Sequence, residues 1–138
     1  MKYVSIPLKE YPIEPSFRMC KDCALFSPNY LNLYASDAAL IDTGATRTSV
    51  SMDIINQLDV LPIRQEKIEI GNTLHDVNVY NVKIMLSPEL IFDIDVYGLP
   101  GEGEGAVIIG MDIIGKGKLT IEPSTGKRHK GELIFPTP

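Results

Sequence analysis

Apolar and polar residues alternate with a period of two along much of this 138-residue chain, and this restricts the fold more than any other feature. Side chains of a β-strand point alternately to its two faces, so each such stretch predicts a strand with one buried face. The alternation is clearest at 4–8, 68–70 and 92–96. Further strand signals lie at 31–33, 38–41, 76–86, 106–110, 119–121 and 133–135.

The breaks between these stretches predict turns and hairpins. Gly71-Asn72 predicts a hairpin tip, and Ser36-Asp37 predicts a turn into the next strand. The segment 98–105 is rich in glycine and predicts a loop, and 123–126 predicts the turn of a closing hairpin. The apolar face changes within 76–86, which predicts either a β-bulge or a strand that passes from an exposed ribbon into the core.

Signals for helices are few. Ser51 is suited to cap a short helix whose inward residues are Ile54, Ile55 and Leu58. A second short helix is expected after Gly110, ending before the glycines at 115 and 117. We therefore expect one mostly β domain over 1–138, folded as a closed barrel with one or two short helices.

Charge and composition disfavour several classes of protein. The net charge is −5, and the only basic run, "GKRHKG" at 126–131, predicts a solvated turn, so nucleic acid is not an expected partner. No apolar run is long enough to span a membrane. The first residues lack the continuous apolar stretch of a secretory signal, which makes a cytoplasmic location the expectation.

Cys20 and Cys23 form a lone C-x-x-C. A zinc site would require two further ligands, and the two histidines, His75 and His129, are not spaced as a ligand pair. A thioredoxin-type site would require a βαβ context, which the flanking sequence does not indicate. We expect two ordinary thiols and no metal or cofactor, while an ordered site shared across a dimer remains an alternative.

The stretch "ALIDTGATRTSVS" at 39–51 raises a question of chemistry. An apolar strand delivers Asp42 into a tight turn whose backbone is eased by Gly44. A carboxylate at the edge of a core is costly unless a neighbour hydrogen-bonds it. Either Asp42 caps its own turn, or it is placed there for a reaction. A second apolar strand ending at Gly110, "VIIGMDII", lies far downstream.

In these two motifs the sequence resembles the retropepsin-like aspartic proteases, the single-lobed relatives of pepsin. "ALIDTGAT" is similar to the family's apolar pair followed by Asp-Thr/Ser-Gly-Ala, and "VIIGMDII" is similar to its downstream apolar-Gly motif. The resemblance covers roughly 30–122 and is closer to the cellular and bacterial branches than to the viral one. It implies the closed barrel of that family.

The resemblance also implies a role for each matching residue. Asp42 would be the catalytic aspartate, Thr43 would hydrogen-bond across a dimer, and Gly44 would let the substrate backbone approach. The residues expected to line the substrate site or pack beneath it are Ala45, Thr46, Gly71, Asn72, Ile109 and Gly110. The hairpin at 66–82 would be the flap that closes over the substrate.

Aspartic proteolysis uses two carboxylates that share one proton, and this chain has one Asp-Thr-Gly. The expected enzyme is therefore a homodimer acting on peptides or proteins. Viral members carry an ion pair at the positions of Thr46 and Met111, and both partners are absent here. The flap also lacks a glycine-rich tip. The alternative function is a dimerisation or peptide-binding module with weak or no proteolysis, and a third is a metal or redox site at the two cysteines.

Overall fold

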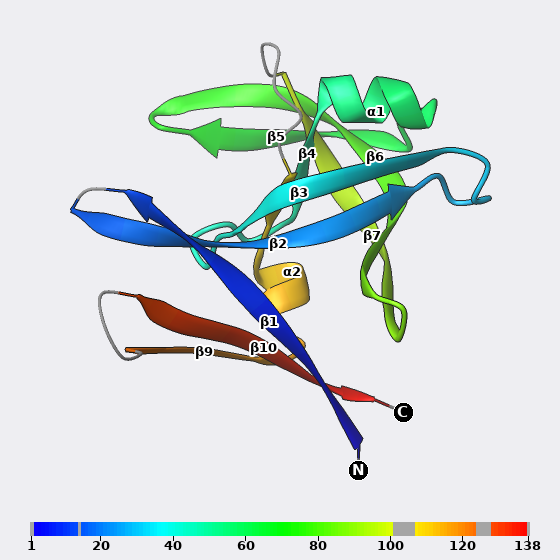
Figure 1. Cartoon of the computed structure of the whole chain (residues 1–138). Coiled ribbons are helices and arrows are strands. Elements are labelled where there is room, and N and C mark those ends of the chain that lie inside the picture. The colour runs from blue at the N-terminus through cyan, green and yellow to red at the C-terminus, as the bar shows by residue number, and fades with distance from the viewer. Residues whose placement is uncertain (1, 14, 101–106, 124–127, 138) are drawn as a thin grey trace.

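The computed structural model describes residues 2–13, 15–100, 107–123 and 128–137. The elements, in chain order, are β1 (Lys2–Ile13), β2 (Ser16–Phe26), β3 (Leu33–Ile41), β4 (Ser49–Ser51), α1 (Met52–Leu58), β5 (Arg64–Ile70), β6 (Thr73–Ser87), β7 (Leu90–Leu99), β8 (Val107–Ile109), α2 (Met111–Ile114), β9 (Lys118–Pro123) and β10 (His129–Thr137). Strands therefore dominate the described part of the chain, as the alternation predicts (Figure 1).

The strands form a closed ring. Their order is β6-β7-β4-β8-β3-β2, and a further pairing between β2 and β6 joins the two ends. Most neighbours are antiparallel, but β3 runs parallel to β8 and β4 runs parallel to β7. The ring agrees with the closed barrel expected from the sequence.

A second, smaller sheet continues from the ring. The first half of β1 pairs with β10, and its second half pairs with β2 of the ring, so one strand belongs to both sheets. Strand β9 pairs with β10 as the predicted closing hairpin, whose turn at 124–127 lies outside the described residues. Lys2 is paired with Thr137, so the two ends of the described chain lie side by side (Figure 1).

The two helices occupy the predicted places. Helix α1 packs on β3, β4 and β7 and buries Ile54, Ile55 and Leu58, as expected. Ser51 stands at its N-cap position, but the hydroxyl is buried and makes no hydrogen bond within the described residues, so the predicted cap bond is absent. Helix α2 starts after Gly110, packs on β8 and buries Ile113 and Ile114.

One prediction about the early strands is wrong, and one early strand was not predicted. The expected turn at Ser36-Asp37 is part of the continuous strand β3, and β2 and β3 shift register here, between Lys21 and Cys23. Two polar residues in sequence reflect an irregular ladder rather than a reversal of the chain. Strand β2, which contains the two cysteines, was not predicted, because the same irregularity interrupts its alternation.

The hairpin of β5 and β6 has its tip at Gly71-Asn72, as predicted, with Ile70 paired to Thr73. Gly71 has a φ of 65°, a backbone conformation that glycine adopts without steric cost. Residues 71–76 are exposed, whereas Val77 and Val79 are buried, and beyond them burial moves to the other face of the strand, at Tyr80, Val82, Ile84 and Leu86. The change of face in β6 therefore marks a strand that passes from an exposed ribbon into the core, the second of the two alternatives.

Candidate active site

Asp42 follows the last residue of β3 and begins a tight turn. Its Oδ1 accepts a hydrogen bond from the Gly44 N–H at 2.8 Å, and its carbonyl accepts one from the Ala45 N–H at 3.2 Å. The self-capping bond considered from the sequence is therefore present. Asp42 is half-buried, and within the described residues its Oδ2 accepts no hydrogen bond. One carboxylate oxygen is held by the turn and the other remains open to a ligand.

Strand β8 and the residue after it lie against this turn. The Asp42 N–H donates to the Ile109 carbonyl at 2.9 Å, and the Met111 N–H donates to the Ala45 carbonyl at 2.7 Å. A Cβ on Gly110 would come within 2.8 Å of the Ala45 carbonyl oxygen, so only glycine lets these two backbones approach so closely. The structure therefore brings the two sequence motifs into direct contact.

A second connection between the motifs was missed from the sequence. The Asp112 carboxylate accepts the Thr48 N–H at 2.9 Å, the Thr48 hydroxyl at 2.7 Å and the Ile113 N–H at 3.0 Å. The Thr48 hydroxyl oxygen in turn accepts the Gly110 N–H at 3.1 Å. Asp112, directly after Met111, thus links the loop that follows Asp42 to α2. An acidic residue in the first turn of a helix after glycine was the available signal.

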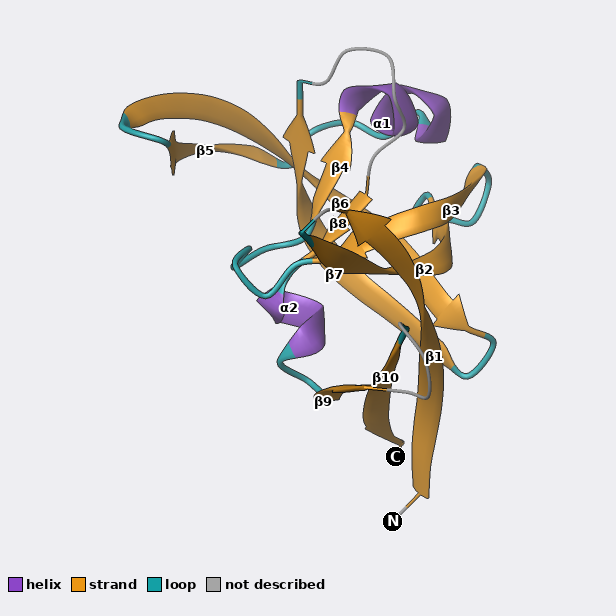
Figure 2. Ribbon diagram, turned by 60° about the vertical axis from the view of Figure 1, so that its left-hand side comes forward, coloured by secondary structure: helices purple, strands orange, loops and turns teal. Residues whose placement is uncertain are grey.

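The other predicted site residues divide into two groups. Thr43 and Thr46 are exposed on the turn itself, and Ala45 is half-buried there. Gly71 and Asn72 form the exposed tip of the β5–β6 hairpin. Both views place this hairpin on the same side of the molecule as the loop that follows β3 (Figures 1 and 2). The turn and the hairpin therefore flank one face of the chain.

A cavity of about 430 Å³ lies beside the turn, at the base of that hairpin. Its lining is mainly charged and comes from the loop after Asp42, from β5 and β7, and from α2 and the residues that follow it. The lining residues are Thr46, Arg47, Arg64, Asp93, Ile94, Asp95, Asp112 and Lys116. Arg47 is three residues beyond Gly44, and Arg64 opens β5. The cavity therefore lies where the base of the β5–β6 hairpin meets the loop that contains Asp42.

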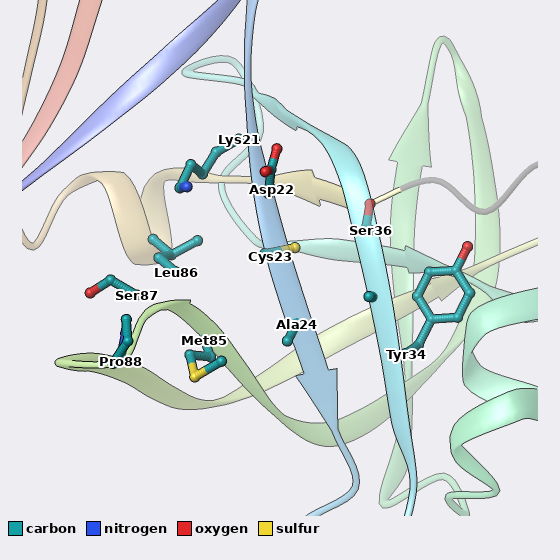
Figure 3. A pocket seen from close by; sticks show the side chains of 11 residues that line it. Lys21, Asp22, Cys23, Ala24, Tyr34, Ser36, Met85, Leu86, Ser87 and Pro88 are labelled. Carbon is teal, nitrogen blue, oxygen red and sulfur yellow. The ribbon is translucent and has the colours of Figure 1, made fainter.

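A larger cavity, about 680 Å³, lies elsewhere, between β2, β3 and the end of β6 (Figure 3). It is lined by Cys23 and by neighbours that include Tyr34, Met85 and Pro88. Cys20 and Cys23 are free and buried, and burial raises the pKa of the Cys23 thiol to about 12. A thiol with so high a pKa is a poor nucleophile and metal ligand near neutral pH.

Neither a metal centre nor a membrane span emerges from the described residues. Nowhere in these ranges do three histidine, cysteine, aspartate or glutamate side chains gather closely enough to hold a metal ion. In the same part of the chain, neither helix has the length and apolar character required to cross a membrane.

No protein-family model and no curated protein matches the sequence. Among solved structures, the chain is similar to a retropepsin-like aspartic protease from Rickettsia conorii, with a TM-score of 0.56 and 11% sequence identity. The likeness covers 97% of this chain and 91% of the other, so it extends well beyond the residues that carry the motifs. At this identity the likeness concerns the fold, and the fold is retropepsin-like.

Proposed function

We propose that the protein is an aspartic endopeptidase that works as a homodimer. The observation that carries the proposal is the state of Asp42: a half-buried carboxylate at a strand end, with Oδ1 fixed by the Gly44 N–H and Oδ2 without a partner in the described chain. A self-capping turn requires only one of these oxygens. The retropepsin-like fold supports the same reading.

The chemistry requires a second carboxylate. In the reaction one carboxylate accepts a proton from a water molecule while the oxygen of that water bonds to the peptide carbonyl carbon. The other carboxyl group donates a proton to the carbonyl oxygen. Collapse of this intermediate breaks the C–N bond, and a proton passes to the leaving nitrogen. One chain supplies one Asp42, so a twofold axis beside its turn would complete the pair. The exposed Thr43 is available to hydrogen-bond the partner's turn.

The proposed pair also fixes the expected pH dependence. Two carboxylates within hydrogen-bond distance share one proton, and activity requires this singly protonated form. Cleavage should therefore follow a bell-shaped profile with its maximum on the acid side of neutral pH. The substrates are peptides or proteins, and the expected compartment is the cytoplasm.

A non-catalytic dimerisation or peptide-binding module is the second candidate. The hairpin favours it, because 66–82 contains a single glycine, Gly71, where an adaptable flap would be richer in that residue. Such a module would bind peptides without hydrolysing them.

Cleavage of a diverse peptide library by the wild type and by Asp42→Asn decides between the two candidates. The substitution keeps the shape of the side chain but removes its charge, so the fold should persist while cleavage disappears. Asp53→Asn, on the exposed side of α1, is the matched control and should cleave like the wild type. Cleavage by Asp42→Asn at the wild-type rate would refute the catalytic assignment, and a monomer in sedimentation with substrate present would refute the dimer.

A further inference from the structure

We propose that Glu66 anchors the β5–β6 hairpin to the loop that contains Asp42, and that it is a positioning residue for this hairpin. The inference rests on the proposed function only for its catalytic consequence. The structural part of the inference concerns three side chains that meet at the base of the hairpin. They are Glu66 of β5, Tyr97 of β7 and Arg47 of the loop at 42–48, which contains Asp42.

Glu66 is well placed for this role, because its two carboxylate oxygens have partners on different elements. Oε2 lies 3.7 Å from Arg47 Nη1 and accepts a hydrogen bond from Arg64 Nε at 2.8 Å. Oε1 accepts the Tyr97 hydroxyl at 3.3 Å. The Glu66 carboxylate thus connects β5 both to the loop and to the wall of the ring.

The partners of Glu66 are themselves fixed. The guanidinium of Arg47 lies over the Tyr97 ring, 5.0 Å from its centroid, and the Tyr97 N–H donates to the Thr48 carbonyl at 3.1 Å. Arg64 also binds Asp95 at 3.0 Å. Each charge in the group therefore has at least one opposite charge beside it, and the Arg64 guanidinium holds the pKa of Glu66 below its usual value, so Glu66 stays ionised at neutral pH.

The alternation of β5 places Glu66 on the half-buried face of the strand. Glu66 and Ile68 are half-buried, whereas Gln65, Lys67 and Glu69 are exposed. The same face of β5 that carries Glu66 at the base therefore continues beneath the hairpin toward its tip. The tip at 71–76 is exposed, so burial of its own side chains does little to fix its position. An anchor at the base therefore limits how far the whole hairpin swings away from the loop.

The hairpin contains a matched ion pair that lacks these features. Lys67 Nζ lies 3.1 Å from Asp76 Oδ1, but the side chains are 71% and 62% exposed, and both residues belong to the hairpin. The side chains of Arg47 and Glu66 are 28% and 29% exposed. Exposed pairs add little to stability, whereas networks of partly buried charges add more. Lys67→Gln is therefore the control for Glu66→Gln.

Hydrogen exchange of the amide groups at 66–79 tests the anchor without reference to activity. Glu66→Gln should accelerate exchange there by about two- to fivefold relative to the wild type, and Lys67→Gln should leave it within about twofold. Tyr97→Phe removes one contact of Glu66 without changing the charge and should give a smaller acceleration. Equal exchange in Glu66→Gln and Lys67→Gln would overturn the anchor.

Kinetics with a cleaved peptide test the catalytic consequence. The anchor orders the hairpin before substrate binds, whereas in Glu66→Gln the hairpin would become ordered only on binding, at a cost to affinity. Glu66→Gln should therefore raise KM by about two- to fivefold, with kcat changed less than twofold. A fall in kcat at constant KM would refute the positioning role. A wild type that cleaves no peptide would refute the proposed function alone, and the exchange result would still decide the anchor.

Discussion

Replacing Asp112 by alanine should destabilise the protein substantially. The carboxylate accepts three hydrogen bonds, from the Thr48 N–H, the Thr48 hydroxyl and the Ile113 N–H. Thr48 is completely buried, so its N–H and hydroxyl would lose this acceptor without access to bulk water. A hydrogen bond contributes roughly 1 kcal/mol, and more to a charged group, while an unsatisfied buried donor costs about 1–3 kcal/mol. Because Asp112 is itself partly exposed, we expect a total loss of about 2–4 kcal/mol.

Urea unfolding followed by circular dichroism measures this loss. With a slope of about 2 kcal/mol per molar urea, typical of a small protein, the midpoint should fall by about 1–2 M. Asp112→Asn keeps one acceptor oxygen and should fall between alanine and the wild type. The control is Asp76→Ala, whose side chain is 62% exposed, and it should stay within about 0.5 kcal/mol of the wild type. A change of under 0.5 kcal/mol in Asp112→Ala would refute the proposed link between the two motifs.

Three further outcomes follow from the geometry. Gly110→Ala should cost about 1–3 kcal/mol in urea unfolding, because its Cβ would meet the Ala45 carbonyl oxygen; wild-type stability would contradict this. Hydrogen bonds from the backbone and side chain of His129 lower the pKa of Glu10 in the folded protein below its unfolded value of 4.5. The Glu10 carboxylate therefore stabilises the fold above pH 4.5, and this stabilisation is lost as the pH falls through the lower pKa of the folded state. Stability should therefore fall less between pH 5 and 2 in Glu10→Gln than in the wild type, and equal slopes would refute the pairing. Cys23 should react with iodoacetamide slowly at pH 8 in the native state and rapidly in urea, because burial raises the pKa of its thiol; equally fast reaction in both states would contradict its burial.

The sequence predicted those elements in which local pattern and tertiary burial agree. Strand β7 alternates cleanly because one face of it lies in the core, and Ile94 and Val96 are both buried. Helix α1 was predicted because three apolar residues at helical spacing face inward. Likewise the hairpin tip at Gly71 was predictable because glycine adopts a positive φ without steric cost.

Where the sequence failed, the determining contacts are distant along the chain. Strand β2 has adjacent buried residues, Met19 and Cys20, and a register shift against β3, so its period of two is broken. The pairing of Thr48 with Asp112 joins residues from opposite halves of the chain, and neither carries a local pattern that names the other. For the site, the sequence predicted which residues come together at the turn, whereas the bonds that hold them were found only in three dimensions.

The pairing of early strands with late ones has a consequence for how the chain folds during synthesis. Strand β3 is completed on one edge by β8, where Leu40 meets Ile108, and β1 is completed by β10, where Lys2 meets Thr137. Neither partner exists until most of the chain has been made. Topologies with such distant pairings fold slowly, and a strand edge that waits for its partner can pair with another chain instead. Slow expression at low temperature, or a chaperone that covers the edge of β3, should therefore raise the soluble yield.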